Sequence, residues 1–147
     1  MFERIVVGTD GSETATEAVH QAIELTKASS AKLDLVAAFE PVSAGRLREE
    51  RAELPGDVNY AVNAREDVNV ALEGALGMAK QQGIDAESYP REGDPADAIL
   101  DVAEEKGADL IVVGNKGMTG AKRFLLGSVP NKVSHHAPCG VYIVRTT

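Results

Sequence analysis

Short apolar runs alternate with helical stripes along this chain, and this alternation constrains the fold more than any other feature. The runs are rich in Val, Ile and Leu, and glycine or proline bounds each of them. Continuous apolar runs of this length are typical of strands that are buried on both faces of a sheet. They lie at residues 5–7, 33–39, 109–113 and 141–144, and a more polar run at 84–91 predicts an edge strand.

Helix signals fill the intervals between these runs. Ser12 and Asp94 are side chains that commonly cap helix N-termini, and Pro95 suits a first turn because its missing N–H costs nothing there. Gly107 is placed to end the second of these helices. Further helical stripes run from residue 68 to a stop near Gly83, and over residues 128–136.

Strands that alternate with helices pair in parallel through right-handed crossovers. We therefore expect one α/β domain over residues 1–147, with an open five-stranded parallel sheet of order 3-2-1-4-5 and helices on both faces. In such a sheet, ligands bind where the strand order reverses, here between the first and fourth strands. Residues 43–60, which include a dense run of charges, are expected to form a surface loop or lid.

Composition excludes several classes of protein. A formal charge of −8 and only six aromatic residues, three Tyr and three Phe, argue against binding of DNA or RNA. No apolar run approaches the roughly 20 residues that span a bilayer, so no membrane partner is expected. The single cysteine, Cys139, and an N-terminus unlike a signal peptide indicate a cytoplasmic protein.

A glycine motif follows the fourth predicted strand, at 109–113, with the pattern G-x2-G-x9-G-S at Gly114, Gly117, Gly127 and Ser128. Glycines let phosphates approach backbone N–H groups, and the helix that starts near Ser128 adds unpaired N–H groups and the positive end of a dipole. We therefore predict a phosphate or nucleotide site, in which Ser128 both caps the helix and contacts phosphate.

Charged and metal-binding side chains near this motif are few. Lys116, Lys122 and Arg123 lie within the glycine loop, and at least one of them is a candidate phosphate contact. His135 and His136 are adjacent on a helix and point about 100° apart, so they do not form a metal pair. A bound Mg²⁺ would instead bridge phosphates and Asp10.

Three motifs in order resemble the universal stress protein family, and the resemblance covers the whole chain. They are residues 5–12 (IVVGTDGS), residues 94–99 (DPADAI), and residues 109–114 followed by 127–129. Members of this family that carry the complete glycine motif bind ATP. The resemblance therefore implies an ATP-binding regulatory stress-response protein.

The resemblance also implies roles for individual residues. Asp10 would contact the ribose or a phosphate-bound metal, and the adenine would lie against the backbone near Ala38. Pro130 departs from the expected arrangement, because it removes one N–H group that could face a phosphate. The remaining contacts implied by the resemblance are Thr9 and Gly11 beside Asp10, and Gly114, Gly117, Gly127, Ser128 and Val129 around the ribose and phosphates.

Several alternatives stay open at this stage. The missing N–H at Pro130 leaves ADP or cyclic AMP as possible ligands in place of ATP. The chain is not expected to be an enzyme, because no Ser-His-Asp arrangement and no Walker A lysine are present, and any ATP hydrolysis should be slow and incidental. An ATP-dependent adenylating enzyme of related fold is the rival from another class, although residues 8–12 match its loop poorly.

The final apolar run, Val141 to Val144, is expected at an edge of the sheet. An uncovered apolar edge invites pairing with another chain. In the family that this chain resembles, the last strand often pairs with its two-fold mate, which implies a homodimer.

Overall fold

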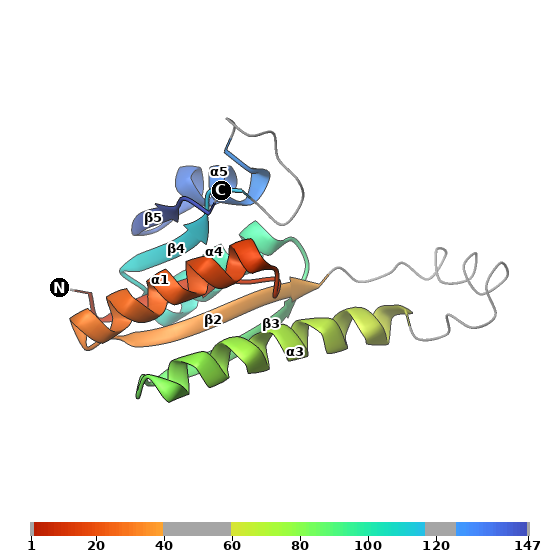
Figure 1. Cartoon of the computed structure of the whole chain (residues 1–147). Coiled ribbons are helices and arrows are strands. Elements are labelled where there is room, and N and C mark those ends of the chain that lie inside the picture. The colour runs from red at the N-terminus through yellow and green to blue at the C-terminus, as the bar shows by residue number, and fades with distance from the viewer. Residues whose placement is uncertain (1, 40–59, 117–125, 147) are drawn as a thin grey trace, which may run out of the picture.

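The computed structural model of the chain describes residues 2–39, 60–116 and 126–146. Five parallel strands form one open sheet in the order β3-β2-β1-β4-β5, which confirms the predicted topology (Figure 1). The predicted loop at 43–60 lies outside the described residues, except for its last residue, Tyr60, which begins a helix. The strands are β1 (Arg4–Gly8), β2 (Lys32–Phe39), β3 (Ala86–Glu92), β4 (Leu110–Gly114) and β5 (Gly140–Val144).

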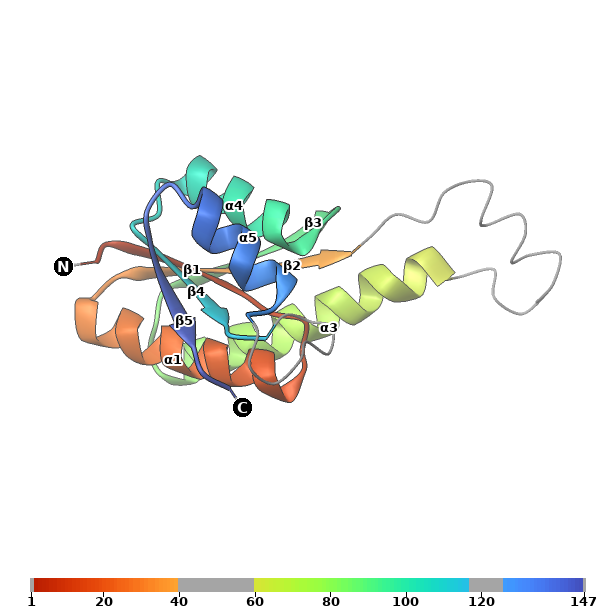
Figure 2. The same ribbon diagram turned by 90° about the horizontal axis from the view of Figure 1, so that it is seen from above.

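Helices cover both faces of this sheet (Figure 2). One face carries α1 (Glu13–Ser29) and α3 (Tyr60–Gln81), and the other carries α4 (Pro95–Lys106) and α5 (Ser128–His136). The helices divide between the two faces in this way because right-handed crossovers that run along the sheet in opposite directions lie on opposite faces.

The strand sequences supply a core to both faces. On β1, Ile5 and Val7 pack into the core under α1 and α3, whereas Val6 between them packs under α4 and α5. All three side chains are completely buried. Successive strand residues point to opposite faces, so a strand covered on both sides must be apolar at every position.

The helix boundaries follow the predicted caps. The Ser12 side chain accepts a hydrogen bond from the Ala15 N–H, and the Asp94 side chain accepts one from the Asp97 N–H. Gly107 ends α4 in the left-handed region, at φ 65°. The helix predicted from the apolar stripe at residue 68 was too short. α3 begins eight residues earlier, at Tyr60, and those eight residues carry no comparable stripe.

The sheet register brings two loops together at one edge. β1 pairs in parallel with both β2 and β4, so the β1–α1 turn and the segment after Gly114 emerge from the same end of the sheet. Gly8 is tightly enclosed there, since a Cβ atom on it would lie 2.4 Å from Ile99 Cδ1. The candidate site is therefore built on the strand-order reversal between β1 and β4.

Candidate functional site

The β1–α1 turn has a fixed internal geometry. Thr9 is almost fully buried, its N–H donates to the Val36 carbonyl at 2.9 Å, and its Oγ1 accepts from the Gly11 N–H at 3.1 Å. Asp10 Oδ1 accepts from the Ser12 N–H at 2.9 Å, which is an Asx turn. Asp10 is therefore a turn-former, and its exposed carboxylate keeps acceptor capacity for a ligand.

Gly11 occupies the one position of this turn that requires glycine. Its φ is +82°, a conformation that L side chains rarely adopt, and a Cβ atom on it would lie 3.0 Å from the Ala71 Cβ atom of α3. The turn therefore lies directly against α3, on the α1 and α3 side of the sheet.

Asn115 connects the segment after β4 to three other parts of the chain. Its N–H donates to the Val144 carbonyl at 2.7 Å, and its carbonyl accepts from the Gly127 N–H at 3.0 Å. Its side-chain Oδ1 accepts from both the N–H and the hydroxyl of Thr146, each at 2.9 Å. Sequence reasoning missed this role, because Asn115 occupies an unspecified position of the glycine motif.

The N-terminus of α5 differs from the prediction at one residue. Gly127, and not Ser128, is the N-cap residue, and no side chain caps this helix. The prediction was wrong because the chain turns one residue earlier than expected, which leaves Ser128 as the first helical residue. Its hydroxyl therefore does not cap the helix.

The first turn of α5 supplies two N–H groups for a ligand. Four N–H groups at a helix start lack partners within the helix. The Gly127 N–H donates to Asn115, and Pro130 has no N–H. The N–H groups of Ser128 and Val129 remain, and neither donates to a residue that the structure describes.

A narrow hollow joins these elements, with a cavity volume of about 20 Å³. Such a space holds little more than one water molecule, so a larger ligand would lie across its mouth. The lining includes three predicted site residues, Gly114, Lys116 and Val129. The other lining residues are Gly8, Ser12, Thr14, Ala15, Ile99, Val113 and Pro130.

Lys116 is the cation of this hollow. Its side chain is half-buried and makes no ion pair with any described residue. A lysine that has no ion pair among the described residues, near N–H groups that donate to none of them, is suited to bind an anion. Lys122, Arg123 and Gly117 lie outside the described residues.

The remaining predicted residues lie around the hollow without lining it. Ala38 is half-buried near the carboxyl end of β2 and packs into the core on the α4 side. Thr9, Asp10 and Gly11 line a different cavity, between α1 and α3. Gly127 is buried behind Ser128.

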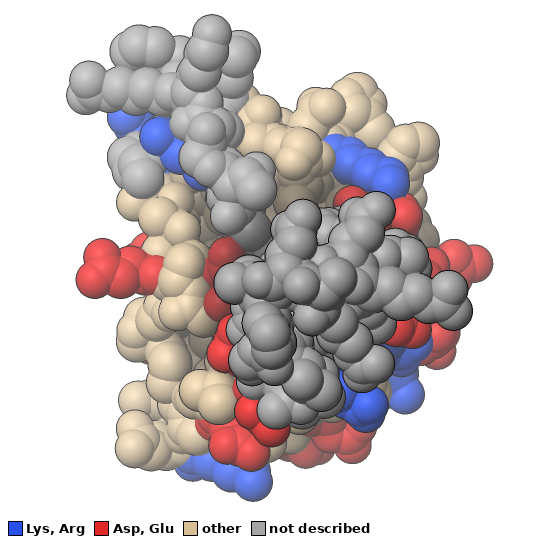
Figure 3. All heavy atoms as spheres, turned by 90° about the vertical axis from the view of Figure 1, so that its right-hand side faces the viewer, with Lys and Arg blue, Asp and Glu red and all other residues tan. Residues whose placement is uncertain are grey.

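The described residues hold no metal-binding cluster, and charges of both signs lie around this edge. Within residues 2–39, 60–116 and 126–146, no cluster of three or more His, Cys, Asp or Glu side chains could hold a metal ion. Figure 3 views the molecule toward this edge and shows acidic and basic side chains interspersed around the grey residues.

Burial raises the pKa of the Cys139 thiol, and the nearby Asp109 carboxylate raises it further.

None of the described helices is both long enough and apolar enough to cross a membrane.

Comparison with known proteins gives consistent matches over the whole chain. The Universal stress protein family model matches residues 1–145. Universal stress protein Rv1636 of Mycobacterium tuberculosis is 37% identical, with 99% of this chain and 98% of that protein covered. Universal stress protein YxiE of Bacillus subtilis is 35% identical, with 99% of this chain and all of that protein covered.

Solved structures agree with the sequence matches. A universal stress protein crystallised in complex with cAMP is 38% identical to this chain, with a TM-score of 0.75 and 99% of each chain covered. The relatives at 35% and 37% identity are named as stress proteins rather than as enzymes. The family model and these relatives cover nearly the whole chain, and this chain therefore belongs to the universal stress protein family.

Proposed function

We propose that this protein binds an adenine nucleotide, ATP in the first instance, and acts as a regulator in a stress response. The observation that carries the proposal is the anion-binding arrangement at the α5 N-terminus. Gly114, Lys116 and Val129 line one hollow where β1 and β4 end, and the N–H groups of Ser128 and Val129 at the start of α5 donate to no described residue. These groups suit phosphate oxygens.

The proposed nucleotide lies along the carboxyl edge of the sheet. Its phosphates contact Ser128, Val129 and Lys116, and Gly114 lets the chain pass close to the ribose. Family resemblance adds Gly117 and Gly127 to this end of the ligand. At the other end, the resemblance places the adenine against the backbone of Ala38.

Asp10 is the proposed contact for the ribose or for Mg²⁺ held by the phosphates. Its carboxylate is exposed, and only the Ser12 N–H donates to it among the described residues. Mg²⁺ commonly uses one or two carboxylates together with phosphates and waters, so a single aspartate fits such an ion. Thr9 and Gly11 hold Asp10 in place through the turn.

Binding without efficient catalysis is the proposed mode of action. Phosphoryl transfer needs a residue that positions the attacking group. Asp10 is the one candidate near the described part of the site, and its carboxylate also holds the turn through Ser12. We expect hydrolysis of bound ATP to be slow, so that nucleotide occupancy itself is the signal.

Cyclic AMP is the second candidate ligand, and two observations favour it. A 38% identical relative was crystallised with cAMP. In this chain Pro130 leaves two N–H groups at the α5 N-terminus that donate to no described residue, which suits a single phosphate better than a triphosphate.

Calorimetric titration with ATP, ADP and cAMP, each with and without Mg²⁺, tests the proposal. ATP that binds most tightly and gains affinity with Mg²⁺ supports the triphosphate reading and the role of Asp10. Preference for cAMP moves the function to second-messenger binding. Absence of binding by all three nucleotides overturns the proposed function.

A further inference from the structure

We propose that the cavity between α1 and α3 is a second ligand site, which takes a small, elongated apolar molecule with a cationic amino group. The cavity has a volume of about 390 Å³. Small-molecule sites commonly have volumes of about 300–1,000 Å³, so this space is large enough for a ligand. Asp10, which the proposed function assigns to the nucleotide, also borders this cavity, so the proposal takes Asp67 as the charged group of the second site and does not require nucleotide binding.

The α3 side of the cavity is a row of residues three or four apart. Asp67, Val70, Ala71, Gly74, Ala75 and Met78 all line the cavity. This spacing places them along one side of the helix, over a length of about 16 Å at 1.5 Å per residue. The cavity is therefore elongated along α3, which favours a linear ligand.

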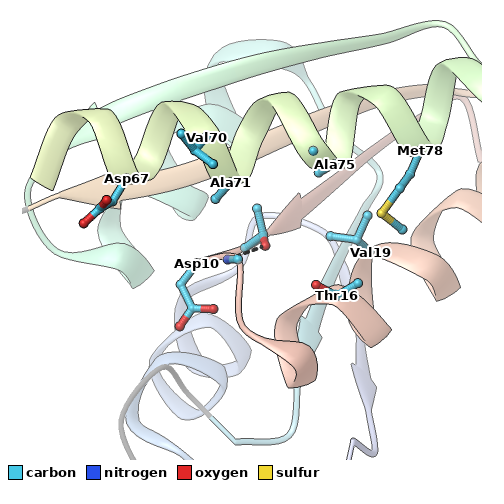
Figure 4. A pocket seen from close by; sticks show the side chains of 11 residues that line it. Asp10, Thr16, Val19, Asp67, Val70, Ala71, Ala75 and Met78 are labelled. Atoms are coloured by element: carbon cyan, nitrogen blue, oxygen red, sulfur yellow. Dashed lines mark hydrogen bonds between the residues drawn. The ribbon is translucent and has the colours of Figure 1, made fainter. Parts of the chain in front are cut away.

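Most of this surface is apolar and open to solvent. Val70 is 68% exposed, which is unusual for a large apolar side chain in this protein. Gly74 adds space, because a Cβ atom on it would meet nothing within 4 Å. Val19 of α1 and Met78 line the end of the cavity away from Asp67 (Figure 4).

Negative charge is confined to one end of the cavity. Figure 4 shows Asp10 and Asp67 toward one end and Met78 toward the other. Neither aspartate forms an ion pair with a described residue, and no Lys, Arg or His is among the described lining residues. A cationic group at this end and an apolar chain toward Met78 would complement both parts.

This cavity is separate from the hollow at the α5 N-terminus. It lies on the side of the sheet that carries α1 and α3, whereas Ile99, Val129 and Pro130 line the hollow from the α4 and α5 side. The lining residues of the two spaces do not overlap. The β1–α1 turn and the start of α1 reach both: Gly11 and Thr16 line the cavity, and Ser12 and Ala15 line the hollow.

A pair of glycines in α3 allows a matched test. Gly74→Leu would fill the cavity, whereas Gly77→Leu would not, because Gly77 does not line it. A Cβ atom at either position meets nothing within 4 Å. Both substitutions also replace a helical glycine with a better helix former, so their effects on the helix are alike.

The probe is n-octylammonium, with n-octanoate as the anion of similar chain length, titrated below micelle formation. ¹H–¹⁵N correlation spectra and calorimetry are recorded for the wild type, Gly74→Leu, Gly77→Leu and Asp67→Asn. We expect saturable binding of octylammonium to the wild type and Gly77→Leu, with the largest shifts in residues 67–78 of α3. Binding should be lost in Gly74→Leu and weakened in Asp67→Asn.

Three results would overturn the proposal. The first is no saturable binding of octylammonium to the wild type, and the second is equal binding to Gly74→Leu when that variant is folded by circular dichroism. The third is equal affinity for octanoate, because the aspartates would then select nothing. ATP affinity measured in Gly74→Leu distinguishes the two sites. Loss of ATP binding in this variant would show that the cavity is part of the nucleotide site and would overturn the proposal of a second site.

Discussion

Among single residues, Asp34 is the most demanding to bury, because its carboxylate lies in the middle of the sheet with no exposed surface. The Arg4 guanidinium binds it with two hydrogen bonds, from Nε to Oδ2 at 2.6 Å and from Nη2 to Oδ1 at 3.0 Å. The Asp34 hydrogen bond also raises the Arg4 pKa. These two hydrogen bonds replace the water molecules that would otherwise hydrate the Asp34 carboxylate.

Arg4→Ala should therefore strongly destabilise the protein. Removal of one partner from a buried ion pair leaves an uncompensated charge, at a cost of about 3 kcal/mol in the free energy of unfolding. Urea unfolding of Arg4→Ala and of the double variant Arg4→Met, Asp34→Leu measures this. The double variant should recover most of the stability, and a loss below about 1 kcal/mol in the single variant would contradict the account.

The sequence could not reveal this pair. The apolar run around residue 34 predicted the strand, but nothing in that run indicates that its one charged residue points inward toward Arg4, 30 positions away. The parallel register of β1 and β2, which pairs Val6 with Asp34, brings the two side chains together.

Tyr89 makes the stability of the folded protein depend on pH in the alkaline range. Burial, followed by the hydrogen bond from its hydroxyl to Glu87 Oε2 at 2.6 Å, raises the pKa of Tyr89 to about 12. Since the folded pKa lies above the unfolded value of about 10, the stabilising contribution is complete below pH 10 and is lost as pH rises toward 12.

Tyr89→Phe should therefore flatten the decline of stability between about pH 10 and pH 12. Urea unfolding of the wild type and of this variant across that range measures the difference. The same slope in both proteins would show that another group causes the decline.

Among the elements, the segment after β4 and the start of α5 depend on Asn115. The structure confirms a helix over residues 128–136, but the sequence misassigned its cap because Ser and Gly are both common N-cap residues. The cap position here is fixed by the Gly127 N–H bond to Asn115, a contact across 12 residues that no local pattern encodes.

Asn115→Ala should loosen the C-terminal segment around Thr146. It removes the acceptor for the N–H and hydroxyl of Thr146, at an expected cost of about 1–2 kcal/mol. Thermal and urea unfolding measure the cost, with the exposed Asn131→Ala of α5 as the control. Equal stability of the two variants would contradict a positioning role for Asn115.

At the level of the whole molecule, the strand order was predictable because alternating strands and helices leave few topologies. The strand-order reversal indicated a site between β1 and β4, and the family resemblance suggested its residues, which stay a prediction. The cavity between α1 and α3 was not predictable. It depends on how α3 lies beside α1 and on the contact between Gly11 and Ala71, which no local pattern encodes.

The outer edge of β5 is the proposed homodimer contact. The structure confirms β5 as an edge strand, with Tyr142 38% exposed and Ile143 half-buried. Ile143→Lys or Tyr142→Asp should shift the mass measured by light scattering from two chains to one, because a charge would have to be desolvated in the contact. Val70→Lys, on α3, is the control. A mass that is unchanged in both β5 variants would exclude this contact.

The most direct test of the central claim is a ¹H–¹⁵N correlation titration of the wild-type protein with ATP and Mg²⁺. The account predicts saturable shifts that are largest at the N–H groups of Ser128 and Val129, at Gly114 to Lys116, and in the turn from Thr9 to Ser12. Shifts confined to other parts of the protein, or none at saturating ATP, would contradict a nucleotide site at the junction of β1, β4 and α5.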